Sequence, residues 1–211
     1  MAFTLTITQS GAWTTGGGTT SAVTTTGANL IVCGLWWHTG SSASFFDSKT
    51  NSWTQIGFQS NGFMGTALYY CIGPTTGSGH TFRTNSNFSG IGMVAVSAGG
   101  ATPTFDRVIG SNSSTSPLTT GSLTPVNNSE LYVTAIGSFN GALPAMPVGY
   151  TYVGANTTSA AEAGAMGYKI GTTTGAENPS WTTTGTNNTA VLGFFKLPTV
   201  ATGNNNFFMF F

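Results

Sequence analysis

Charged residues are nearly absent from this chain of 211 residues. Five Lys and Arg and five Asp and Glu make up 5% of it and give a net charge of zero, whereas ordinary globular domains carry about 25%. We expect no nucleic-acid partner, because that affinity needs clustered Lys and Arg to neutralise phosphates. A neutral surface gives little repulsion between copies, so we expect a homo-oligomer or docking within an assembly.

Long apolar runs are also missing. No stretch reaches the 18 apolar residues typical of a membrane-spanning helix, so we expect no insertion into a membrane. The opening MAFTLTITQS lacks the basic start and apolar centre of a signal peptide, and its alternation of apolar residues with Thr favours a half-buried strand. We therefore expect synthesis in the host cytoplasm without a signal peptide.

The few acidic residues argue against an enzyme. They are scattered along the chain, whereas glycoside hydrolysis needs two carboxyl groups about 5 to 10 Å apart; they are Asp47, Asp106, Glu130, Glu162 and Glu177. No G-x-S-x-G nucleophile elbow occurs, although a Ser, His and Asp set that meets only in space stays open. Asp47 stands in FFDSKTNSW, which predicts a turn with an Asx-type hydrogen bond. We expect no catalytic residues.

The chain contains an internal sequence repeat with two copies. Residues 28–98 and 129–197 share residue types in order and spacing, so that GTALYYCIGPTTG matches AGAMGYKIGTTTG. A repeat of this length implies two copies of one multi-strand unit. Each copy of about 70 residues is small for a separate core, so we expect one domain over residues 1–211. Residues 99–128 then cross between the halves, and residues 204–211 form an apolar tail.

The pattern of residues predicts strands almost throughout, because runs rich in Val, Ile, Thr and aromatic residues alternate with Gly, Asn, Ser and Pro clusters. We expect an all-β fold, a single jelly-roll-like β-sandwich built from two duplicated halves. With charged gatekeepers nearly absent, its strand edges need cover or partners. Strands are predicted near residues 3–9, 29–37, 52–58, 65–72, 80–85, 91–98, 105–110, 130–137, 150–154, 164–170, 180–184 and 189–197.

Cysteine and histidine offer little for cofactor chemistry. Cys33 and Cys71 lie in strand-like runs, but Thr134 and Lys169 stand at the matching places of the second copy. Free, half-buried thiols are therefore favoured over a disulfide, which stays open. The two histidines complete no close-spaced ligand set, so we expect neither a metal nor another cofactor.

Aromatic residues give two candidate contact sites. Trp36, Trp37 and His38 precede a small polar loop, and neighbouring strand residues point to opposite sheet faces, so one Trp is expected in the core and the other exposed. The exposed one would contact a glycan or anchor an interface, and core or interface roles are favoured.

The second candidate is the carboxyl-terminal tail. Its apolar members are Phe207, Phe208, Met209, Phe210 and Phe211. Burying a Phe contributes about 1.5 to 3 kcal/mol, so leaving the tail in water is costly. It either packs on its own domain or inserts between subunits or into a partner, and both alternatives stay open.

The motifs NLIVCGLWW, DSKTNSWTQIG, GTALYYCIG and GMVAVSA, with their second-copy partners over residues 28–197, make the chain resemble Gly- and Thr-rich β-sandwich structural proteins of tailed-bacteriophage virions. The resemblance implies a non-enzymatic, oligomeric role on the virion surface. A capsid decoration or cement protein is favoured, with major capsid or tail proteins as partners. The alternative is a tail, fibre or adhesin module that binds carbohydrate through exposed aromatic residues, since such sandwiches serve several functions.

Overall fold

The computed structural model describes residues 2–12, 18–38, 43–86, 89–157 and 162–198. Every regular element in these ranges is a β-strand, which confirms the all-β prediction. Across the same ranges there is accordingly no helix with the length and apolar character needed to cross a membrane. The apolar tail from Phe207 to Phe211 lies outside the described residues.

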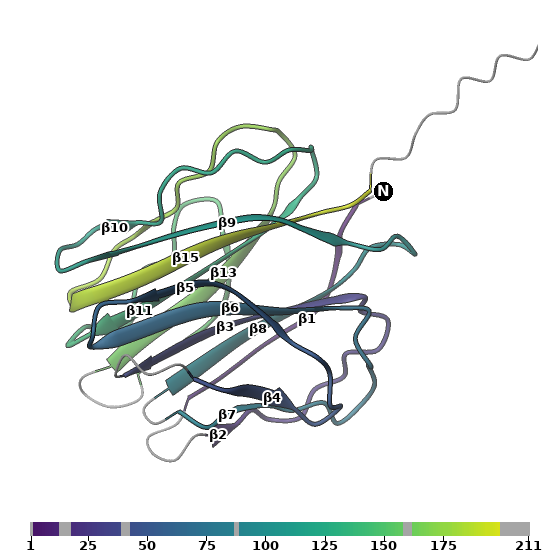
Figure 1. Cartoon of the computed structure of the whole chain (residues 1–211), viewed down its shortest axis with the longest axis horizontal. Helices are drawn as coiled ribbons and strands as arrows, with labels where there is room; N and C mark the ends of the chain where they lie inside the picture. Colours follow the sequence, from purple (N-terminus) through teal and green to yellow (C-terminus); the bar gives the residue numbers. More distant parts are fainter. Residues whose placement is uncertain (1, 13–17, 39–42, 87–88, 158–161, 199–211) are drawn as a thin grey trace, which may run out of the picture.

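Two five-stranded antiparallel sheets form a β-sandwich, and Figure 1 shows one lying over the other. The first sheet has the order β1 (Thr4–Ala12), β8 (Ser89–Ser97), β3 (Leu30–His38), β6 (Met64–Ile72) and β5 (Thr54–Ser60). The second has the order β12 (Thr151–Thr157), β13 (Glu162–Ile170), β11 (Leu131–Phe139), β15 (Thr186–Lys196) and β9 (Thr104–Ser113).

The two sheets have the same strand order when their strands are matched along the chain, with β1, β3, β5, β6 and β8 corresponding to β9, β11, β12, β13 and β15. This agrees with the predicted repeat, while duplication as the origin of the chain stays a prediction. Each sheet uses one contiguous half of the chain, and strands do not pass repeatedly between sheets. The jelly-roll-like part of the prediction is therefore not supported. The crossing segment supplies edge strand β9, which agrees with the strand predicted near residues 105–110.

The central core lies between the sheets and uses both halves of the chain. From the first sheet it takes Leu30, Val32, Trp36, Val94 and Val96, and from the second Leu131, Val133, Met166, Val191 and Phe195. These residues alternate along their strands, as expected for the inner faces of two packed sheets.

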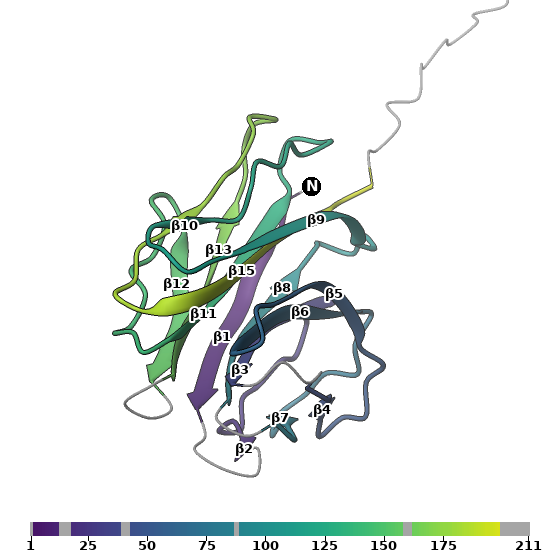
Figure 2. The same ribbon diagram turned by 60° about the vertical axis from the view of Figure 1, so that its left-hand side comes forward.

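The outer faces of both sheets are covered as well. A small sheet of β2 (Gly18–Thr19), β7 (Phe82–Thr84) and β4 (Phe45–Asp47) lies over the first sheet, at the bottom of Figure 2. The pair β10 (Leu118–Thr119) and β14 (Ser180–Trp181), with nearby loops, packs on the second sheet. Each central strand is therefore buried on both faces, which is why LIVCGLWW in β3 is apolar or small throughout instead of alternating.

This cover contradicts one expectation about the tryptophans. Trp36 and Trp37 do point to opposite faces, but both are 0% exposed. Trp36 lies in the central core, and Trp37 lies in the core beneath the small sheet together with Phe45 and Phe82. The alternation of a strand determines the face of each side chain but not what packs on that face.

Glycines make room for the two indole rings. Gly90 lies opposite Trp36 in the ladder and Gly65 lies opposite Trp37, and a Cβ at either position would come within 2.4 Å of the indole. Gly164 on the facing sheet approaches Trp36 in the same way, with a Cβ that would lie 2.3 Å from the ring. The indole of Trp36 therefore occupies a glycine-lined space between the sheets.

The edges of the sandwich are protected by irregular pairing. All four edge strands, β1, β5, β9 and β12, meet their neighbours through ladders with a register shift. Bulges of this kind bend an edge and interrupt its row of unpaired backbone groups, which discourages pairing with other chains. Edge strand β9 also carries the charged residues Asp106 and Arg107. The edges therefore have some protection within the chain itself, and pairing with other subunits stays a prediction.

Replacing Gly164 with Ala is expected to lower the free energy of unfolding by about 1 to 3 kcal/mol, because overfilling a packed core displaces its neighbours. The measurement is urea unfolding followed by Trp fluorescence. Gly175→Ala is the matched control, since Gly175 is exposed, its nearest neighbour atom lies 3.5 Å from the added Cβ, and its variant should stay within about 0.5 kcal/mol of the parent protein. Equal stability of the two variants would contradict the glycine-lined packing of Trp36.

Candidate functional site

Of the residues predicted to form contacts, His38 alone reaches solvent among those that the structure describes. Its side chain is 26% exposed, its Nδ1 lies 3.2 Å from Glu162 Oε1, and its ring stacks on Phe139 with centroids 5.2 Å apart. Trp36 and Trp37 are buried and present no ring face to a ligand. The five apolar residues of the tail, Phe207, Phe208, Met209, Phe210 and Phe211, lie outside the described residues.

Both cysteines are free thiols, as the sequence favours, but they are buried instead of half-buried. Cys33 and Cys71 lie on neighbouring strands but are paired in the ladder with Tyr69 and Ile31 and not with each other. Burial, reinforced by the nearby charge of Asp47, raises the pKa of both thiols. They are therefore poor nucleophiles and behave as core residues.

All five carboxylates have partners within the protein. Asp106 contacts Arg107 Nε at 3.0 Å and Lys196 Nζ at 2.9 Å, and Glu177 contacts Lys169 Nζ at 2.6 Å. Glu130 is fully buried and accepts the backbone N–H of Asn127 at 2.7 Å, while burial raises its pKa. Glu162 contacts His38, and Asp47 is described next. No three His, Cys, Asp or Glu side chains in the described ranges are grouped closely enough to hold a metal ion.

Asp47 organises a buried polar network beneath the small sheet. Its Oδ1 accepts the backbone N–H groups of Lys49 at 2.7 Å and Asn51 at 3.2 Å, which confirms the predicted Asx-type turn. Its Oδ2 accepts Trp53 Nε1–H at 2.7 Å and lies 3.7 Å from His80 Nε2. The other ring nitrogen of His80 lies 2.9 Å from the hydroxyl of Thr25.

The order of hydroxyl, imidazole and carboxylate in Thr25, His80 and Asp47 is that of a nucleophilic triad. The hydroxyl is inaccessible to a substrate, however, because Thr25 and the side chains of His80 and Asp47 are all 0% exposed. The network instead ties the turn after β4 to the segment that contains His80 and to the chain around Thr25. Its role is structural.

The second half of the chain has a different polar group in the corresponding place. Leu123 and Glu177 form an isolated antiparallel β-bridge, as Val23 and His80 do in the first half. Glu177 therefore takes the position of His80. Glu177 contacts Lys169 and accepts the hydroxyl of Tyr150 at 3.4 Å, at the wall of a shallow cavity of about 200 Å³. Burial, followed by the charge of Glu177, raises the pKa of Tyr150. Lys169 and Glu177 pair with each other at this cavity, so neither charge is left unpaired for a ligand.

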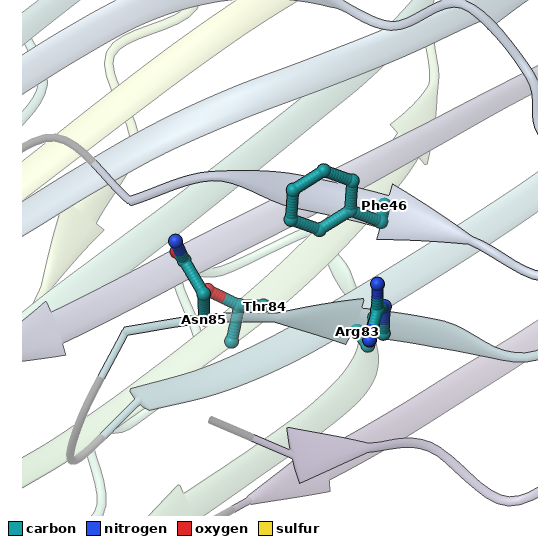
Figure 3. Close-up of a pocket in the computed structure, with 4 residues that line it drawn as sticks. All are labelled: Phe46, Arg83, Thr84 and Asn85. Atoms are coloured by element: carbon teal, nitrogen blue, oxygen red, sulfur yellow. The ribbon is translucent and has the colours of Figure 1, made fainter. Parts of the chain in front are cut away.

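A second hollow, of about 280 Å³, opens on the outside of the small sheet and is lined by Phe46, Arg83, Thr84 and Asn85 (Figure 3). Phe46 on β4 is paired with Arg83 on β7, and the guanidinium carbon lies 5.0 Å from the ring centroid. Phe46 is 42% exposed. This is the candidate binding site that the geometry favours.

The sequence alone did not reveal this hollow, and the alternation that forms it is visible only in the burial of the folded strands. In FFD and FRT the first residues, Phe45 and Phe82, are buried and the next ones, Phe46 and Arg83, are exposed. Short strands of this kind show the alternation of a half-buried sheet. Their pairing, which brings Phe46 beside Arg83, depends on the tertiary fold.

The Asp47 network predicts a loss of stability in acid. Burial alone would raise the pKa of Asp47, but the contact with His80 and the hydrogen bonds from Asn51 and Trp53 outweigh it and lower the pKa to about 2. A lowered folded-state pKa stabilises the protein above the unfolded value near pH 4, and that contribution disappears as the pH falls towards 2. We expect Asp47→Asn to cost roughly 2 kcal/mol at pH 7.

Urea unfolding of both proteins at several pH values between 7 and 2 measures this effect. Because Asn resembles a protonated Asp, the curves of the parent protein and Asp47→Asn should converge near pH 2. A stability difference that is the same at pH 7 and pH 2 would show that Asp47 acts by shape alone.

Phe46, Arg83 and Asn85 surround an accessible hollow, whereas the buried network of Asp47 and the ion pair of Glu177 hold the cover layers together. Comparison of the chain with protein-family models, with curated proteins and with solved structures gives no match in any of the three.

Proposed function

We propose that the protein is a non-enzymatic structural subunit of a tailed-phage virion, and more specifically a capsid decoration or cement protein. The observation that carries this proposal is the near-neutral exterior. The chain has only five acidic residues, and each is engaged by an internal partner. The solvent-facing surface is therefore polar but almost uncharged, which suits close docking against neighbouring subunits.

The proposed mechanism is passive. A sandwich whose sheets are covered on both faces is rigid, because its packed cores resist deformation. Such a subunit can offer the same surfaces at every equivalent position of a symmetric shell, where weak contacts add through multivalency. Exposed apolar side chains such as Val148, Phe63 and Leu143 supply possible contact points outside the cores. The partners are then major capsid or tail proteins and further copies of this chain.

A second candidate function, a tail, fibre or adhesin module that binds carbohydrate, is favoured by one observation. Phe46 exposes its ring beside Arg83 and Asn85 in the hollow of Figure 3. Aromatic rings with nearby polar groups bind amphipathic ligands in this manner. Trp36 and Trp37 cannot serve, because they are buried.

Particles assembled with and without this chain test the cement role directly. We expect particles that lack it to assemble but to release their nucleic acid at a lower temperature, because the contacts that bridge neighbouring subunits are missing. The measurement is a heating series with a dye that fluoresces on free nucleic acid. Identical release temperatures, or absence of the chain from purified particles, would contradict the cement role.

The tail provides a second test in solution. We expect the full chain to form a defined oligomer and a chain that ends at Gly203 to be monomeric, because removing the residues from Phe207 to Phe211 takes away their apolar contacts. Light scattering at several concentrations measures the masses, and urea unfolding of both chains detects a tail that packs on its own domain. Two monomers of different stability would contradict an assembly role for the tail.

A further inference from the structure

Arg83 has a free charge in a protein with very few charges. Arg107, Lys169 and Lys196 each pair with a carboxylate. The five acidic residues all lie in the described part of the chain, and none of them is paired with Arg83, whose side chain is exposed. The guanidinium is therefore available to an anion from outside.

The guanidinium is also held in place. It lies over the ring of Phe46 with 5.0 Å between its central carbon and the ring centroid, and the two residues form a cross-strand pair of β4 and β7. A guanidinium held beside an aromatic ring still has N–H groups that can make a two-pronged contact with a carboxylate. The cost of ordering the side chain on binding is thereby reduced.

The other polar groups of the hollow favour a ligand that carries hydrogen-bond acceptors. The Oδ1 atom of Asn85 accepts the backbone N–H of Ser44 at 2.9 Å, and Asn85 is exposed, so its Nδ2 group can serve as a donor. The hydroxyl of Thr84 is engaged by the N–H of Ser86 at 3.1 Å, and Thr84 is only 4% exposed. The described residues of the hollow thus present N–H donors, one positive charge and one apolar ring (Figure 3).

These features together identify a class of ligand. A volume of about 280 Å³ is at the small end of ligand sites and suits one sugar-sized group. Phosphate or sulfate alone would satisfy the donors but leave the exposed ring of Phe46 unused. A sugar acid has both a carboxylate and a carbon-hydrogen face that packs on an aromatic ring.

We propose that this hollow binds a carboxylate-bearing saccharide, with Arg83 contacting the carboxylate, Phe46 packing on the sugar ring and Asn85 donating to a ring oxygen. The proposal specifies the site and the ligand class of the second candidate function, and it does not depend on the virion role. If the chain is part of a virion but binds no such saccharide, the saccharide proposal fails. If the chain binds the saccharide but is absent from virions, the virion proposal fails.

Calorimetric titration of the full chain with oligogalacturonic acid tests this site, beside a neutral galactose oligomer of the same length and inorganic phosphate. We expect the acidic oligomer to bind and the neutral oligomer to bind at least about tenfold more weakly, because the charge-assisted hydrogen bonds are lost. Tighter binding of phosphate than of the acidic oligomer, or no binding of the acidic oligomer, would overturn the proposal.

Variants of single residues locate the binding. Arg83→Gln should weaken binding of the acidic oligomer about tenfold or more, and Phe46→Ala should weaken it as well. Lys49→Gln is the matched control, because it removes the same charge from a Lys that has no carboxylate partner among the described residues and does not line the hollow. Equal losses of affinity in Arg83→Gln and Lys49→Gln would show that binding depends on the overall positive charge of the protein and would overturn the proposed site. Urea unfolding verifies that each variant is folded.

Discussion

Burial of both faces of each five-stranded sheet is the constraint on which the rest of this structure depends. An antiparallel sheet can leave one face in water, and its strands then alternate between apolar and polar residues. Here the inner faces meet in a central core, and the outer faces lie beneath short strands and loops. The central strands are consequently apolar or small on both sides, and these strands have few positions where a charged side chain could be placed.

Close packing around two tryptophans shows how strict this constraint is. Trp36 and Trp37 are adjacent in the sequence but belong to different cores, and each faces a glycine on the neighbouring strand. Glycine is ordinarily weakening inside a strand. In this protein the lost side chain provides the volume that the indole occupies, so the glycines and tryptophans are parts of one arrangement.

The cover layers are where the two halves of the chain differ. In the first half the buried carboxylate of Asp47 meets His80 and Trp53, whereas in the second half Glu177 meets Lys169 and Tyr150 near the surface. Both arrangements give the carboxylate partners within the protein, and an unpaired carboxylate would be costly to bury. The first cover also presents the hollow beside Phe46 and Arg83, so the layer that closes a core also forms the candidate binding surface.

Each strand predicted from sequence has a counterpart, because long runs of β-branched and aromatic residues between turn residues are a local signal. The strands β2, β4 and β10, of two or three residues, were missed, since segments this short carry no clear periodicity. The Asx turn at Asp47 was predicted because its hydrogen bonds join residues close in the chain. The exposure of a tryptophan was predicted wrongly because the cover that buries Trp37 comes from elsewhere in the sequence.

The all-β class, most strand positions, the repeated pattern and the scarcity of charge can be predicted from the sequence, because these features depend on composition and on local spacing. Tertiary structure decided which strands pair, that both faces of each sheet are covered, and that Arg83 lies over Phe46 with no carboxylate beside it. These features depend on contacts between residues far apart in the chain, and a single sequence does not encode such contacts in any local pattern.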